Sequence, residues 1–287
     1  MERPRYVVIT GVSSGIGYDG ARYMVERGWH VFGSVRKGED GERVQAALGE
    51  RFTPRLFDVT DGGAIGTAVE QVAEQVGDKG LWGLVNNAGI AVAGPLMHLP
   101  IEEFRQQLEV NVVGQLRVTQ AFLPLLGARK DATHPPGRIV NISSVSGRIV
   151  YPFLGPYAAS KHALEALSDA LRRELMIYGV DVIVIEPGSI KTPIWDKAGE
   201  MDFAPFVGTA YETILGQMQK TFVRQGQTGI EVEKVSELIW EALVKERPKS
   251  RYVLPRKWLS GWIIPRWLPD RWFDNIVARR LGIERKA

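Results

Sequence analysis

Short apolar, β-branched runs alternate along this chain with longer amphipathic stretches. The apolar runs predict strands at residues 6–10, 30–35, 81–86, 138–142 and 180–185, and the end of another strand at 55–59. The amphipathic stretches predict helices at residues 15–27, 39–48, 101–126 and 156–178, and one from an N-cap at Asp61 to about residue 76. The run at 180–185 has the apolar density of a strand buried on both faces. This alternation predicts an α/β fold, a doubly wound parallel sheet with right-handed crossovers.

Composition adds a boundary near the C-terminal end. The chain has 287 residues, of which 45% are hydrophobic and 24% charged, as in a globular protein with one large domain. Residues 247–287 hold 11 Lys or Arg against 3 Asp or Glu, a local charge of +8 in a chain of net charge +3. Four of the eight tryptophans fall between residues 258 and 272. We predict a single domain over residues 1–255 and a basic, Trp-rich extension over 256–287.

Several classes of protein are disfavoured by what the sequence lacks. There is no cysteine, so disulfides, cysteine metal ligands and cysteine nucleophiles are excluded. The four histidines are scattered without a metal-binding spacing, and we expect no metal site. A net charge of +3 does not indicate a nucleic-acid binder. No apolar run is long enough to span a membrane and no secretory signal is visible, so we expect a cytoplasmic protein.

A glycine-rich turn joins the first predicted strand to the first predicted helix. Glycine is needed where the backbone takes a positive φ or approaches a ligand closely, and the helix that opens here offers unpaired N–H groups to a pyrophosphate. Tight strand–helix turns also use glycine for structural reasons alone, but this position in an alternating α/β chain favours a dinucleotide site. The candidate cofactor residues in this turn are Gly11, Ser13, Ser14, Gly15, Ile16 and Gly17.

The end of the second predicted strand bears on which nicotinamide cofactor binds. Sites for NAD place an acidic residue there to bind the ribose 2′-hydroxyl. Here Val35 stands at that place, Arg36 and Lys37 follow, and the first carboxylate is Glu39. Arg36 and Lys37 are either solvated loop charges or partners for a 2′-phosphate, which a guanidinium binds well. We predict NADP(H) as the cofactor, with Arg36 at the 2′-phosphate.

Three polar residues are candidates for catalysis. Tyr157 and Lys161 are one helical turn apart, so their side chains are neighbours. A phenol has a pKa of about 10, and a nearby lysine cation would lower it. Ser144 lies just past the fifth strand, on the ligand side of an open α/β sheet, and Ser143 and Ser146 are alternatives.

Taken in order, these segments resemble the motifs of the short-chain dehydrogenase/reductase family. The family pattern T-G-x-x-x-G-x-G matches residues 10–17, N-N-A-G matches 86–89, and P-G-x-x-x-T matches 187–192. The resemblance covers residues 5–255, is greatest to the 17β-hydroxysteroid and retinol dehydrogenase-like branch, and implies a Rossmann fold. It also implies these further cofactor-binding residues: Asp58, Val59, Asn87, Ala88, Gly89, Tyr157, Lys161, Pro187, Gly188, Ile190 and Thr192.

The same resemblance implies the catalytic roles. Tyr157 would give a proton to the substrate oxygen as NADPH gives a hydride to the carbonyl carbon, and Ser144 would hydrogen-bond that oxygen. Lys161 would lower the pKa of Tyr157 and bind the nicotinamide ribose. Asn111 falls in the middle of a predicted helix, where asparagine is unfavourable. Its amide is either satisfied by the backbone or, as the resemblance implies, lies in a helix distortion that holds a water linking Lys161 to solvent.

The substrate is indicated only in broad terms. Residues 193–226 match a substrate lid of the family, and the apolar content of this segment favours a lipophilic substrate such as a steroid or retinoid-like ketone or alcohol. The alternatives are a reductase of small aldehydes or ketones, and a protein that senses NADP without turnover. The presence of both Tyr157 and Lys161 favours an enzyme over a sensor.

Assembly and the C-terminal extension complete the expectations. The resemblance implies a homodimer or homotetramer through helices at about 102–126 and 157–178, and we predict that Leu164, Leu171 and Leu175 face away from the sheet. Residues 258–268 either pack on the lid or a partner subunit, which we favour, or make peripheral contact with a membrane. Pro265 and Pro269 are expected to break any long helix there. Residues 270–281 predict a short helix ended by Gly282.

Overall fold

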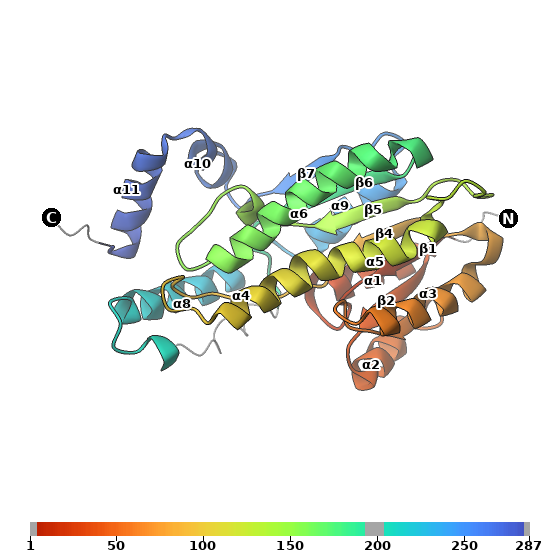
Figure 1. The fold of residues 1–287 in the computed structure, drawn as a ribbon, viewed down its shortest axis with the longest axis horizontal. Helices are drawn as coiled ribbons and strands as arrows, with labels where there is room; N and C mark the ends of the chain where they lie inside the picture. The colour runs from red at the N-terminus through yellow and green to blue at the C-terminus, as the bar shows by residue number, and fades with distance from the viewer. Residues whose placement is uncertain (1–4, 193–203, 284–287) are drawn as a thin grey trace.

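Seven parallel strands form the centre of the computed structural model, which describes residues 5–192 and 204–283. The strands are β1 (Tyr6–Ile9), β2 (His30–Val35), β3 (Phe52–Leu56), β4 (Gly83–Asn86), β5 (Arg138–Ile142), β6 (Asp181–Pro187) and β7 (Arg251–Leu254). Their order, β3-β2-β1-β4-β5-β6-β7, confirms the doubly wound parallel sheet (Figure 1). The direction of winding reverses between β1 and β4, which is where such sheets bind ligands.

Helices cover both faces of this sheet. They are α1 (Gly15–Glu26), α2 (Gly38–Leu48), α3 (Gly62–Val76), α4 (Ile101–Leu108), α5 (Gln115–Phe122), α6 (Gly155–Glu174), α8 (Glu212–Gln227), α9 (Glu233–Val244), α10 (Ile264–Trp267) and α11 (Asp270–Leu281). Successive residues of a strand point to opposite faces. Val7 of β1 therefore joins a core with α1, α2 and α9, whereas Val8 joins one with α3, α5 and the end of α6.

Short helical turns, mostly of 3-10 type, complete the element order. These are η1 (Gly77–Lys79), η2 (Glu109–Gly114), η3 (Leu123–Leu126), η4 (Val145–Gly147), η5 (Leu175–Tyr178), η6 (Ala204–Phe206) and η7 (Leu259–Ile263). Both η2 and η7 are π-helical. The predicted continuous helix over residues 101–126 is therefore wrong in detail. The π-helical turn interrupts it at Asn111, which confirms the distortion expected at that residue.

Two strand assignments also differ from the sequence-based prediction. β3 ends at Leu56, so the segment predicted to end a strand at 55–59 is mostly a loop. β7 was not anticipated. It has four residues, of which only Tyr252 is buried, so it carries no strong apolar signal of its own. It is nevertheless parallel to β6 and extends the sheet at that edge.

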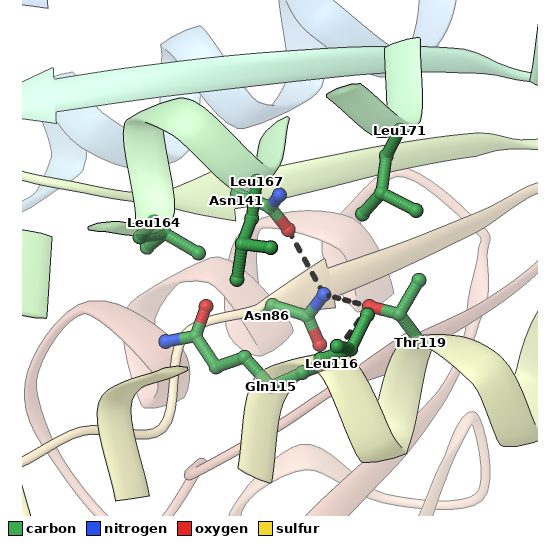
Figure 2. A pocket seen from close by; sticks show the side chains of 8 residues that line it. All are labelled: Asn86, Gln115, Leu116, Thr119, Asn141, Leu164, Leu167 and Leu171. Carbon is green, nitrogen blue, oxygen red and sulfur yellow. Dashed lines mark hydrogen bonds between the residues drawn. The ribbon is translucent and has the colours of Figure 1, made fainter. Parts of the chain in front are cut away.

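The leucines expected to face away from the sheet lie inside the chain. Leu164 and Leu175 are buried, and Leu171 packs against the core beneath α3 and α5, so that prediction is wrong. Figure 2 shows Leu164 and Leu171 around a small cavity that α5 and α6 enclose against the sheet. Asn86 crosses it, and its amide donates to Thr119 (2.8 Å) and Asn141 (2.9 Å). This polar bridge joins the ends of β4 and β5 to α5.

The C-terminal extension forms two short helical pieces that lie to one side of the sheet (Figure 1). α11 spans the predicted helix and ends at Gly282 in the left-handed conformation, φ 67°, as expected. The helical run of η7 and α10 ends at Trp267, before Pro269, so no long helix forms there, as predicted. Pro265 itself lies within the run, in the first turn of α10. In the described residues, no helix combines the length and apolar character that a membrane span requires.

Candidate active site

The glycine turn between β1 and α1 has a backbone that side chains would obstruct. Gly11 and Gly15 take φ values of 70° and 61°, in the left-handed region. A Cβ on Gly17 would lie 2.2 Å from the Gly11 carbonyl oxygen, so only glycine fits there. Ser14 precedes α1 and gives it no side-chain cap, which leaves the first N–H groups of the helix open to an anion. These features fit a dinucleotide pyrophosphate.

The N-N-A-G segment after β4 is bonded directly to that turn. The Thr10 hydroxyl accepts the backbone N–H groups of Asn87 and Ala88, each at 2.9 Å. The Asn87 amide in turn donates to the carbonyls of Thr10 (2.8 Å) and Gly11 (3.1 Å). The two segments form one rigid wall at the switch point of the sheet. Thr10 was not a predicted site residue, although it opens the matched motif.

The segment after β6 reaches the same place from the other side. A Cβ on Gly15 would lie 3.5 Å from the Cβ of Thr192, so Thr192 stands against the opening of α1. Ile190 is buried and pairs with Ile230, while Gly188 donates to the Leu254 carbonyl (2.9 Å). Pro187 ends β6. The predicted cofactor segments therefore converge although they are far apart in sequence.

The adenine end of the predicted site lies beyond β2 and β3. Asp58 is held in its loop because its Oδ1 accepts the Thr60 N–H (2.9 Å) and hydroxyl (2.7 Å). Val59 is buried beside Gly114. Both lie at the carboxyl end of the sheet, with Val35 and the glycine turn. This position fits the predicted contact with an adenine ring.

Cations replace the acidic residue that an NAD site would carry at the end of β2. Arg36 is exposed directly after the buried Val35. A second guanidinium, Arg43 of α2, donates to the carbonyl oxygen of Ser13 in the glycine turn (2.8 Å) and pairs with Asp40. Sequence reasoning missed Arg43, because nothing local links it to a turn 30 residues away. Two guanidiniums at this end favour an anionic group on the ribose.

Ser144 and Tyr157 meet at the carboxyl end of β5. Ser144 follows the strand, opens η4 and accepts the Ser146 N–H at 3.0 Å. Tyr157 lies in the first turn of α6. The helix begins at Gly155, shortly after a turn that contains Pro152. Burial raises the pKa of the Tyr157 phenol, and its side-chain hydrogen bond with Ser144 partly offsets that effect. The phenol is therefore protonated at neutral pH.

Lys161 lies one turn along α6 and is buried. Its ammonium donates to the Ile142 carbonyl oxygen (2.9 Å) and lies 5.7 Å from the centre of the Tyr157 ring. Burial lowers the Lys161 pKa to about 8, against the opposing charge of Glu165. Burial dominates the pKa of the Tyr157 phenol and raises it, and the expected lowering by Lys161 stays a prediction.

Asn111 is satisfied by the backbone of the loop after β4. Its Oδ1 accepts the Ile90 N–H (2.9 Å), and its Nδ2 donates to the Ile90 carbonyl (3.0 Å) and the Ser160 hydroxyl (3.2 Å). Gln107, one turn earlier, repeats this pattern with Ile90, Val92 and Ser160. Both interpretations of Asn111 thus hold in part, because the helix is distorted and the amide is paired. Gln107 was missed, although its i, i+4 spacing to Asn111 was visible.

An ionic cluster that sequence reasoning also missed lies behind Lys161. The Glu165 carboxylate pairs with Arg148 (3.1 Å) and Arg251 (3.0 Å). Glu186 of β6 lies between the same two guanidiniums at 3.6 and 3.4 Å. Burial, and then the charge of Glu165, raises the Glu186 pKa to about 7. The cluster joins α6 to β6 and β7, the strand that no local pattern predicted.

An apolar cluster closes the catalytic end of the molecule. Phe153, two residues before α6 begins, is buried with Phe206, Leu215 and Met218. Phe153 takes a φ of 67°, which is unusual for a non-glycine residue. The lid expected over residues 193–226 is described only from residue 204, so its apolar residues Ile194, Trp195, Met201 and Phe203 lie outside the described residues. The described part supports an apolar surface beside Tyr157.

The candidate cofactor site and the side chains of Ser144, Tyr157 and Lys161 lie at the carboxyl end of the sheet. This arrangement suits hydride transfer coupled to protonation of an oxygen. The described residues contain no group of histidines and carboxylates able to hold a metal ion.

A family model described as short chain dehydrogenase matches residues 5–202. The chain is 48% identical to an NADPH-dependent 3-dehydrocapnine reductase from Ornithobacterium rhinotracheale, covering 96% of this chain and 97% of the relative.

Two further comparisons agree with this match. The chain is 33% identical to human 17-beta-hydroxysteroid dehydrogenase type 6, over 96% of this chain and 88% of the relative. The crystal structure of a short-chain dehydrogenase from Streptomyces avermitilis superposes with a TM-score of 0.73 and 28% identity, over 89% of both chains. Both the sequence and the fold of this chain are thus similar to those of short-chain dehydrogenases.

Proposed function

The chain belongs to the short-chain dehydrogenase family, and from that membership we propose that it reduces the keto group of a lipophilic substrate. It is an NADP-dependent oxidoreductase of this family. The observation that carries the proposal is the meeting of Ser144, Tyr157 and Lys161 beside the glycine turn, in a chain 48% identical to an NADPH-dependent reductase. A protein that only senses NADP would not need this set of polar residues.

The substrate proposed is 3-dehydrocapnine or a keto compound closely similar to it. The relative named for that substrate shares 48% of its residues with this chain, whereas the human hydroxysteroid dehydrogenase shares 33% over the same 96% of the chain. The apolar cluster around Phe153 and Phe206 suits a lipophilic substrate. A steroid or retinoid-like ketone is the second candidate, supported by the likeness to the hydroxysteroid branch.

The residues of the candidate cofactor site fit the cofactor. The pyrophosphate would be held by the glycine turn and the open N-terminus of α1, with Arg36 and Arg43 at the 2′-phosphate. When bound, NADPH supplies the hydride that adds to the carbonyl carbon. Lys161, which is buried and has a pKa of about 8, is mostly charged at neutral pH and would hold the nicotinamide ribose.

The protein's own groups would then complete the reduction at the substrate oxygen. Tyr157 donates the proton, which its raised pKa keeps in place at neutral pH. Ser144 hydrogen-bonds the same oxygen and stabilises the negative charge that develops on it. Asn111 is a positioning residue, because its amide fixes Ile90 and Ser160 rather than facing the reacting atoms. A water relay from Lys161 past Asn111 stays a prediction.

The experiment is an NADPH-oxidation assay over four carbonyl substrates: 3-dehydrocapnine, a 17-ketosteroid, retinal and a short-chain aldehyde. We expect the highest kcat/KM with 3-dehydrocapnine and little turnover of the short aldehyde, because burial of apolar area at the lid stabilises only the larger substrates. A preference for the ketosteroid would select the second candidate. No NADPH oxidation with any of the four would contradict the proposed substrate class.

A further inference from the structure

The C-terminal extension carries a row of exposed apolar side chains that the fold does not use. We define the tail ridge as Trp258, Leu259, Ile263, Trp267, Trp272 and Ile276. Trp267 is 83% exposed, Trp272 66% and Trp258 57%, which is unusual for the largest apolar side chain. The residues come from η7, α10 and α11, so the ridge runs over the whole extension. Sequence reasoning favoured packing of residues 258–268, but of the three tryptophans there only Trp262 is buried.

The opposite side of the extension is what attaches it to the protein. In α11, Val277 is buried, and Phe273, one turn away, contacts the ring of Tyr151 at 6.0 Å. Leu281 and Ile283 pack against the apolar cluster of Phe153 beside the catalytic end. Positions 273, 277 and 281 are one helical turn apart, as are Trp272 and Ile276 on the outer side. The extension is therefore amphipathic, and its inner side is already occupied.

Cations border the ridge. Residues 256–283 contain six Lys or Arg and two Asp, and all six cations are exposed without an ion pair among the described residues. They are Arg256, Lys257, Arg266, Arg271, Arg279 and Arg280, of which Arg266 lies 4.7 Å from the centre of the Trp262 ring. Trp at the boundary of an apolar surface, flanked by exposed cations, is the composition of a helix that lies in a lipid interface. Exposed charges elsewhere form ion pairs, such as Arg105 with Glu102 and Lys234 with Glu237, whereas none of the described ion pairs lies in the extension.

We propose that the tail ridge binds the surface of an anionic lipid bilayer, with its tryptophans among the acyl chains and its cations on the headgroups. Charge favours a bilayer over a second copy of the chain. A two-fold contact between two ridges would bring six cations against six cations, which repel each other. An anionic surface instead attracts each of them.

The location of the ridge connects it to the candidate active site. α11 contacts α8, and its last turn packs beside Phe153, two residues after Tyr151 and four before Tyr157. Figure 1 shows α10 and α11 lying on the same side of the molecule as α8. Lipid binding by the ridge does not depend on the proposed function. From a bilayer surface the ridge would also bring a lipophilic substrate to the candidate active site, and this addition rests on the proposed function.

The test is co-sedimentation of the full chain with vesicles, in the absence of substrate and cofactor. Vesicles of phosphatidylcholine alone are compared with vesicles that also contain phosphatidylserine. We expect binding to the anionic vesicles that weakens as salt is raised. The variant Trp267→Ser/Trp272→Ser should bind at least about tenfold more weakly for each tryptophan removed. Lys257→Gln/Arg271→Gln should lose about fivefold per cation.

Matched controls use exposed residues far from the extension. Ile177→Ser removes a side chain that is 80% exposed after α6, and Arg173→Gln removes an exposed cation of α6; neither should change binding. Absence of binding to anionic vesicles, or binding unaffected by the tryptophan variant, overturns the proposal. The proposal is also overturned if the native chain does not bind vesicles and the tryptophan variant has a different mass in solution from the native chain. The ridge would then be a contact between copies of the chain. Because no turnover is measured, this outcome is separate from failure of the proposed reductase.

Discussion

The carboxyl group of Glu186 gives a quantitative test of the packing behind the site. Both of its oxygens are buried and have no hydrogen-bond donor within reach among the described residues. Its two nearest cations, on Arg148 and Arg251, lie at 3.6 and 3.4 Å and are shared with Glu165. Charging Glu186 is therefore costly, and its pKa is raised from 4.5 to about 7.

The raised pKa fixes the sign and size of a pH effect on stability. The native state holds the Glu186 proton more tightly than the unfolded state does, so its contribution to stability is greatest below pH 4.5 and is lost as the pH rises through about 7. One pKa unit corresponds to ~1.36 kcal/mol, so a rise of this size corresponds to about 3 kcal/mol. Glu186→Gln removes this titration. The free energy of unfolding of the native protein, minus that of the variant, should therefore fall by about that amount as the pH rises through about 7.

The assay is urea unfolding at several pH values between about 5 and 8, where the raised and ordinary pKa values separate the two states. A pH-independent change in packing caused by the substitution cancels in this comparison. The control Glu174→Gln, at an exposed position at the end of α6, should show no such trend. A difference that stays flat with pH, or grows as the pH rises, would show that Glu186 is a stabilising ion-pair partner and would refute the reasoning.

Three further outcomes test other parts of the molecule. Gly17→Ala should weaken NADPH binding at least about tenfold in a fluorescence titration, because its Cβ would overlap the Gly11 carbonyl; native affinity would contradict the candidate cofactor site. Arg36→Ala should weaken binding of NADPH more than of NADH, by about tenfold for a lost charge-assisted bond, and equal losses would reject the 2′-phosphate contact. Light scattering at micromolar concentration should give a dimer or tetramer, which Val113→Glu, at an exposed apolar position of η2 between α4 and α5, dissociates; a monomeric native protein would reject this.

Much of the fold could be predicted because its signals are local. Alternating apolar runs and amphipathic stretches predicted six of the strands, and Gly282 after a one-sided apolar pattern predicted α11. The distortion at Asn111 was expected from a polar residue in mid-helix. The short strand β7 escaped because four partly exposed residues have no period that distinguishes them from a loop.

The missing parts of the site are those made by residues far apart in the chain. Arg251 reaches Glu165 across 86 positions, and Arg43 reaches the glycine turn across 30. No spacing in the sequence reports such contacts. The same limit applies to the extension, where an amphipathic pattern shows that one side is apolar without showing which side the body covers. The pKa of Tyr157 also depends on burial, which spacing to Lys161 does not reveal.

The most direct test of the account is the Tyr157→Phe variant, measured for NADPH affinity and for turnover of 3-dehydrocapnine. The substitution removes one hydroxyl at the carboxyl end of β5 and leaves the glycine turn untouched. Positioned proton transfer is worth about 10²–10⁴-fold in rate, so we expect kcat to fall within that range while the Kd for NADPH stays at its native value. A variant that keeps more than roughly a tenth of the native turnover would contradict Tyr157 as the proton donor.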